Sequence, residues 1–159
     1  MASEIVSMLI TRFAKHLKRG LKDLHELPLM LNIGFFVLTV PSELSKVDLM
    51  EFLHALRRAQ RAHGHSVAGF EEVVRLRQFW LNLPVLRWRD TCYVRALTLY
   101  RFLDCERGDL KIHFGVEPDV GPRGRLKGHA WVTLNGHVLE ERAVLERPVR
   151  EIYVHPPSR

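Results

Sequence analysis

The stretch that decides the fold is DTCYVRALTLYRFL, residues 90–103. Its apolar side chains recur at helical spacing and Asp90 or Thr91 can cap the start, so we expect a helix from about Thr91 to Cys105. Cys92 then falls in the first turn, where backbone N–H groups and the helix dipole favour an anion. A thiolate is stabilised there, although a lone cysteine in an apolar helix is most often a buried structural residue.

The second informative stretch is GHAWV, residues 128–132, in which His129 enters a strand between two small residues. Small neighbours leave room for a substrate backbone beside the imidazole. Residues 110–116 alternate like a strand, Asn135-Gly136 predicts a hairpin after residues 128–134, and residues 149–154 predict a further strand. The second half of the chain therefore predicts an antiparallel sheet behind the cysteine helix.

A carboxylate on the returning strand of the hairpin can fix the tautomer of His129 and stabilise its imidazolium form. A two-residue turn leaves only Glu140 on the face of the histidine. A three-residue loop with Gly136 left-handed places Glu141 opposite His129 instead. We expect the three-residue loop, with Glu141 as the acid and Glu140 as the alternative.

Together these features predict Cys92 as a nucleophile and His129 as its base. A nucleophile that attacks a carbonyl also needs hydrogen-bond donors for the developing oxyanion. The N–H of Cys92 is one. The indole N–H of Trp88 or of Trp80 is the second donor that the sequence suggests, against the alternative that both are ordinary core tryptophans.

The first half of the chain is helical by periodicity. Residues 5–24 predict a basic amphipathic helix, and residues 29–40 an apolar segment bounded by Pro28 and Pro41. Two more helices follow, ending near Gly64 and at Pro84. We expect an α+β protein with a helical region over residues 1–85, a possible partner-binding surface, and a catalytic core over residues 86–159.

Composition sets the remaining limits. The chain has 159 residues, a formal net charge of +6 and two cysteines. Basic residues are mixed with acids and do not alternate with aromatics, so we expect no nucleic-acid partner. The cysteine and histidine spacings predict no metal site, and we expect no cofactor. Reduced thiols and an N-terminus without a signal-peptide pattern favour the cytoplasm, while membrane contact stays open.

Residues 90–103, the sequence Phe114-Gly-Val116, the GHAWV strand and Asn135-Gly136 resemble the leader peptidases of lasso-peptide biosynthesis. The resemblance covers about residues 86–145. It implies a transglutaminase-like fold and a Cys92–His129–acid triad. The family's third member is usually an aspartate, and the matching position here is Glu141.

The resemblance also implies a substrate and partners. The substrate is a ribosomally made precursor, cut between leader and core. The partners are a small leader-recognition protein and an ATP-dependent cyclase that closes the freed amine into a lactam. Residues 1–85 show no strand pattern like that of a recognition module, so we expect it on another chain.

Two other functions remain open. One is an acyl transferase that passes the thioester to an amine rather than to water. The other is a non-catalytic module that keeps the fold and binds a partner through its helices.

Overall fold

The structure is a computed structural model that describes residues 24–62, 68–103, 108–117, 127–140 and 149–156. Nearly all of the predicted basic helix over residues 5–24 lies outside these ranges. So do the predicted helix end at Gly64 and two residues of interest, Cys105 and Glu141.

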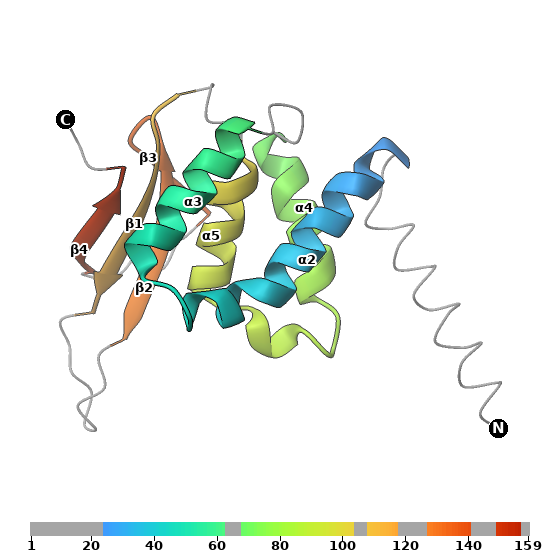
Figure 1. The fold of residues 1–159 in the computed structure, drawn as a ribbon, viewed down its shortest axis with the longest axis horizontal. Coiled ribbons are helices and arrows are strands. Elements are labelled where there is room, and N and C mark those ends of the chain that lie inside the picture. The colour runs from blue at the N-terminus through green and yellow to red at the C-terminus, as the bar shows by residue number, and fades with distance from the viewer. Residues whose placement is uncertain (1–23, 63–67, 104–107, 118–126, 141–148, 157–159) are drawn as a thin grey trace.

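The sheet has four antiparallel strands in the order β3-β2-β1-β4. They are β1 (Leu110–Val116), β2 (Gly128–Leu134), β3 (His137–Leu139) and β4 (Arg150–His155). The long central pair β1–β2 carries the histidine strand, and β4 lies on the other side of β1 (Figure 1). The predicted hairpin and the predicted strand near the C-terminus are both confirmed.

The helices lie together on one side of the sheet, with α5 against the strands and α2 farther away (Figure 1). The α-helices are α2 (Leu27–Leu44), α3 (Leu49–Ala62), α4 (Phe70–Leu81) and α5 (Cys92–Phe102). Short 3-10 turns precede α2 (η1, Leu24–Glu26) and α5 (η2, Arg87–Arg89). These elements confirm the predicted α+β class.

One core joins helices and sheet. Alternate residues of β1 and β2 are buried towards α5, and the helices contribute the rest. The fully enclosed members include Ile33, Val37, Leu53, Val73, Leu76, Leu97, Leu110, Ile112, Ala130 and Val132. Elements on both sides of residue 85 therefore share a single interior, and helices α2, α3 and α4 are part of it.

Helix α2 is longer than the apolar segment in the sequence suggested. Pro28 stands in its first turn, where a missing N–H costs nothing, but the helix continues through Pro41 to Leu44. Among the described residues, the run Leu24–Leu44 is the one stretch of helix long and apolar enough to cross a membrane. Because the same helix supplies buried core residues, its length and composition do not by themselves make it a membrane span.

The outer face of α2 is apolar as well. Leu31, Phe35 and Leu38 are spaced four and three residues apart, and Phe35 is 70% exposed. We call these three residues the α2 strip. Large exposed apolar side chains gathered on one helix face are a common feature of binding surfaces.

Candidate active site

Cys92 is the first residue of α5. The Thr91 side chain caps the helix by accepting a hydrogen bond from the Val94 N–H at 3.3 Å, so of the two predicted caps the structure uses Thr91. The thiol is half-buried and donates towards the Gly128 carbonyl oxygen, with 3.8 Å between sulfur and oxygen. This position at the helix start favours the thiolate, as the sequence predicts.

Gly128 is the residue before His129 on β2, so the contact places the Cys92 sulfur one residue along the backbone from the histidine. Helix α5 packs against β2. The structure therefore brings the start of α5, which carries the Cys92 thiol, close to the start of β2, which carries the His129 imidazole.

His129 is paired with the carboxylate of Glu117, which is neither of the two acids predicted from the sequence. Its Nε2 lies 3.0 Å from Oε1 of Glu117, and both side chains are largely buried. Glu117 directly follows β1, and its N–H donates to the Lys127 carbonyl oxygen at 3.0 Å, which extends the β1–β2 pairing past the strand ends.

The position of Glu117 follows from the pairing of the strands. Gly115 is the partner of His129, so residue 117 lies two positions further on and on the same face of the sheet. In the sequence, Glu117 begins a Gly- and Pro-containing stretch over residues 117–127 that favours a surface loop. The signal that was available was an acid just past the end of a strand predicted to neighbour the histidine strand.

The predicted three-residue loop in the hairpin is wrong. Leu134 pairs with His137, which leaves a two-residue turn in which Asn135 and Gly136 have φ values of 52° and 80°. Two left-handed residues form a turn whose twist matches that of the flanking strands, and Asn-Gly is the preferred pair for it. The register used to choose Glu141 therefore does not form between β2 and β3.

Of the two predicted glutamates the structure describes Glu140, and Glu140 does not hold His129. Glu140 takes a left-handed backbone, with φ of 67°, and this ends β3 at Leu139, before the predicted Glu141. Its carboxylate pairs with the buried guanidinium of Arg77 from α4. Glu141 itself lies outside the described residues.

The two tryptophans proposed as oxyanion donors already donate elsewhere. The Trp88 indole N–H donates to the Val85 carbonyl oxygen at 3.0 Å, and the Trp88 side chain is exposed. The Trp80 indole N–H donates to the Met30 carbonyl oxygen at 2.8 Å. The structure therefore does not support either of them as the second donor.

Tyr93 is a side chain near the thiol that the sequence did not single out. A Cβ built on Gly128 would lie 2.3 Å from the Tyr93 hydroxyl, so this hydroxyl rests directly on the glycine beside Cys92. Burial raises the pKa of Tyr93, and the neighbouring Cys92 charge raises it further. The hydroxyl thus stays protonated at neutral pH and can donate a hydrogen bond.

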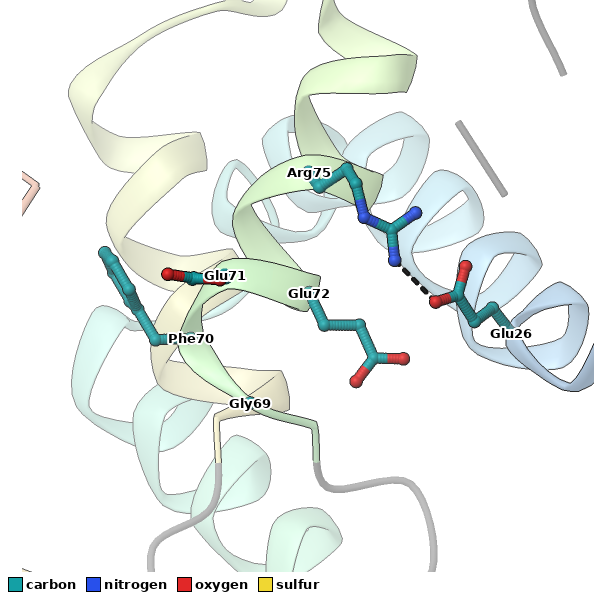
Figure 2. A pocket seen from close by; sticks show the side chains of 6 residues that line it. All are labelled: Glu26, Gly69, Phe70, Glu71, Glu72 and Arg75. Atoms are coloured by element: carbon teal, nitrogen blue, oxygen red, sulfur yellow. Dashed lines mark hydrogen bonds and ion pairs between the residues drawn. The ribbon is translucent and has the colours of Figure 1, made fainter. Parts of the chain in front are cut away.

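The cavity shown in Figure 2 has a volume of about 710 Å³ and lies elsewhere. It is lined by Glu26, Gly69, Phe70, Glu71, Glu72 and Arg75, with an ion pair of 2.6 Å between Arg75 and Glu26. Ala68 beside it bridges to Leu103, just past the C-terminal end of α5, whereas Cys92 begins that helix. The cavity and the thiol are at opposite ends of α5. Within the described ranges, no three metal-ligating side chains gather in one place.

Comparison with known proteins agrees with this architecture. The family model described as the transglutaminase-like superfamily matches residues 37–154, a span from within α2 to within β4. Searches of curated proteins and of solved structures find no match. Since the matched span exceeds half of the chain and includes α5 and β2, the protein belongs to the transglutaminase-like superfamily.

Proposed function

We propose that this protein is a cysteine peptidase that removes the leader from a ribosomally made lasso-peptide precursor. The superfamily includes both cysteine peptidases and acyltransferases. The observation that carries the catalytic part is the placement of the Cys92 sulfur at a helix start beside the strand of His129, whose Nε2 is held by Glu117. The substrate class rests on the sequence resemblance over residues 86–145.

The first half of the reaction forms a thioester. His129 donates its Nε2–H to Glu117, which leaves Nδ1 as the lone pair that accepts the Cys92 proton. The thiolate attacks the scissile carbonyl carbon, and the carbonyl π electrons move to oxygen. When the tetrahedral intermediate collapses, the C–N bond breaks and the imidazolium gives its proton to the leaving amine.

The second half consumes water. Water loses a proton to His129, attacks the thioester carbonyl and expels the Cys92 thiolate, which gives a leader carboxylate. The carboxylate of Glu117 stabilises the imidazolium in both halves. The oxyanion is held by the backbone N–H of Cys92, and the Tyr93 hydroxyl is the side-chain donor that we place beside it.

The proposal includes a partner, the leader-recognition protein, and a cytoplasmic setting in which thiols stay reduced. We place the partner on the α2 strip, because it is a row of exposed apolar side chains on an element far from the sheet (Figure 1). The freed amine of the core is then the substrate of the ATP-dependent cyclase.

The test is incubation of the purified protein with its co-encoded precursor, with and without the recognition protein, followed by mass spectrometry of the products. We expect slow cleavage at the leader–core junction that accelerates strongly with the partner, and none with Cys92→Ala. Incorporation of an added amine in place of water would identify an acyl transferase. Binding of the precursor with no product from either route would identify a non-catalytic module.

The partner surface has its own variant. Phe35→Glu places a charge in the α2 strip and should remove the partner's acceleration while leaving the slow basal rate. Ile152→Glu is the matched control, because Ile152 is 62% exposed on β4. Equal acceleration in both variants would move the partner surface away from α2.

A further inference from the structure

The turn before the nucleophile is held by a chain of charged residues that the proposed mechanism does not use. Asp90 lies two residues before Cys92, and both of its carboxylate oxygens accept from the Arg95 guanidinium, at 2.7 Å from Nε and 2.9 Å from NH2. Two parallel hydrogen bonds between these groups fix orientation as well as distance. The pair therefore bridges the residue before the helix cap and the first turn of α5.

The same turn is tied to the other half of the fold. Arg77 of α4 is completely buried, and its NH1 donates to the Arg95 carbonyl oxygen at 3.3 Å. Its NH2 donates to Glu140 at the end of β3, and its Nε has no hydrogen-bond partner in the described part of the chain. A buried guanidinium is costly to desolvate, so its retention between α4, α5 and β3 indicates a positional role.

The charge of Asp90 matters for the thiol. Two residues of extended chain span about 7 Å, so an unpaired carboxylate at this distance would repel a thiolate at Cys92. The hydrogen bond and charge of Arg95 hold the pKa of Asp90 below its usual value against the opposing effect of burial, with a smaller contribution from Arg77. The carboxylate is thus ionised, and Arg95 offsets its field at the sulfur.

Other charged or titratable groups lie on the elements around the thiol. Tyr93 lies on the same helix, His129 comes from β2, and Glu117 and Lys127 flank the strand ends. His129 is the group that takes the thiol proton, and the pair Glu117–His129 is unchanged by substitutions at Asp90 or Arg95. Differences among variants of Asp90 and Arg95 therefore report on the pair that these two residues form.

We propose that Arg95 is a positioning residue of the active site, which clamps Asp90 so that Thr91 caps α5 at Cys92 and which neutralises the carboxylate nearest the thiolate in the chain. Arg77 supports it by anchoring the first turn of α5 to α4 and β3. This inference rests on Cys92 being the nucleophile of the proposed function.

The experiment measures the rate of Cys92 alkylation by iodoacetamide as a function of pH, with the modified residue identified by mass spectrometry. Arg95→Gln should move the midpoint of the profile upward by roughly 0.5–1 pH unit, because the carboxylate is no longer neutralised. At a pH below both midpoints the alkylation rate should fall by about 3-fold to 10-fold. Arg95→Lys keeps the charge but loses the paired hydrogen bonds, and the midpoint of its alkylation profile should lie close to that of the unmodified protein.

A double variant separates charge from folding. In Asp90→Asn with Arg95→Gln, neither the carboxylate nor the guanidinium remains, so the midpoint should return to that of the unmodified protein while precursor cleavage stays impaired in kcat. Arg58→Gln is the matched control, since it removes an equal charge from an exposed site on α3. Circular dichroism of each variant reports whether the fold is kept.

The inference is overturned if Arg95→Gln leaves the midpoint where it was, or if Arg58→Gln shifts it equally. It is also overturned if the double variant keeps the raised midpoint. Alkylation needs no peptidase activity, so its outcome is independent of the proposed reaction. A shifted midpoint in a protein that cleaves no precursor would sustain the clamp and refute the peptidase.

Discussion

At the scale of single residues, the partner of His129 that the described part of the chain provides is a carboxylate. Nε2 of His129 is engaged by Glu117 at the end of β1, in a largely buried site where a carboxylate interaction is weakly screened. That geometry favours the tautomer with the proton on Nε2, and in the proposed reaction Nδ1 is then the base. The proposal therefore needs Glu117 as well as Cys92.

Replacing the acid should therefore be costly. Glu117→Gln keeps the shape but removes the charge that stabilises the imidazolium, and we expect kcat for precursor cleavage to fall by roughly 10²-fold to 10⁴-fold. Glu140→Gln should act mainly on stability, since Glu140 pairs with Arg77. If Glu141→Gln abolishes cleavage while Glu117→Gln does not, the acid is the one suggested by the family resemblance.

The two thiols should differ in reactivity. Cys92 begins α5 and gains from the helix dipole and from His129, whereas Cys105, which lies outside the described residues, comes three residues after the last residue of that helix in the sequence and is not expected to share the helix start. Iodoacetamide at mildly acidic pH should label Cys92 first, and the loss of cleavage should follow that labelling. If iodoacetamide labels Cys105 preferentially and the cleavage activity survives, the assignment of Cys92 as nucleophile is wrong.

These residues also show what the sequence could predict of the site. Helical spacing and a capping residue located Cys92, and the small neighbours located His129, because both signals are local. Glu117 depends on the pairing of β1 with β2, which no local pattern near Pro118 reveals. The prediction of the hairpin register is wrong, because Asn-Gly prefers the two-residue turn that the structure shows and not the three-residue loop that would place Glu141 opposite His129.

At the scale of elements, the site depends on how closely the start of α5 approaches the start of β2. Gly128 permits this approach, since any side chain there would meet the Tyr93 hydroxyl. Tyr93 in turn packs near Phe114 of β1, with 6.0 Å between ring centroids. A glycine and an aromatic ring therefore define the gap between thiol and histidine strand.

Widening that gap should impair the chemistry more than the fold. Gly128→Ala should lower kcat at least about 10-fold, because a misplacement of about 1 Å is enough to lose a near-attack geometry. Tyr93→Phe removes the hydroxyl that collides and, with it, our proposed oxyanion donor. In the double variant, kcat should therefore fall by less than the product of the two single fold-changes. A fall equal to that product would contradict the contact between Gly128 and the Tyr93 hydroxyl.

Strand β4 carries a second titratable feature. His155 is buried, and its pKa is lowered by burial first and then by the positive charges of His54 and Arg57. Above pH 6.5 the imidazole is neutral in folded and unfolded chains, so it has no effect there. As the pH falls below 6.5, the unfolded chain binds a proton that the folded chain does not, and stability is lost.

We therefore expect the free energy of unfolding to fall with pH below 6.5, by at most about 1.4 kcal/mol per pH unit from this one group. His155→Gln should flatten that part of the curve. His137→Gln, at an exposed position after the hairpin turn, should not. Urea titrations at pH 7, 6 and 5 would measure the free energy of unfolding. If it falls equally with pH in the unmodified protein and in both variants, His155 is not the source.

At the scale of the whole molecule, the helical half and the sheet half depend on one interior. Residues of α2 and α4 are enclosed together with residues of α5, β1 and β2. The sequence predicts the helices and favours a buried helix or contact segment over residues 29–40, but it does not show which elements cover that segment, because an apolar face does not identify its packing partners. The family match over residues 37–154 also includes both halves, from within α2 to within β4.

A shared interior predicts one cooperative transition. Ile33→Ala empties a fully enclosed site on α2 and should destabilise the protein by about 2–5 kcal/mol, while Leu31→Ala on the exposed face of the same helix should change it by less than about 0.5 kcal/mol. Far-ultraviolet dichroism and tryptophan fluorescence should give coincident curves. Separate transitions for helix and sheet signals would show two folding units.

The early position of α2 in the chain has a consequence for synthesis on the ribosome. A run apolar enough to cross a membrane emerges before α4 and α5, the helices that pack against it, and roughly 60 residues separate its end at Leu44 from the end of α5 at Phe102. At about 5–20 residues per second, the nascent chain carries this uncovered segment for several seconds. Until α5 has been made, the partial chain presents to chaperones, and to any targeting machinery that binds apolar helices, a segment that the finished protein covers in part.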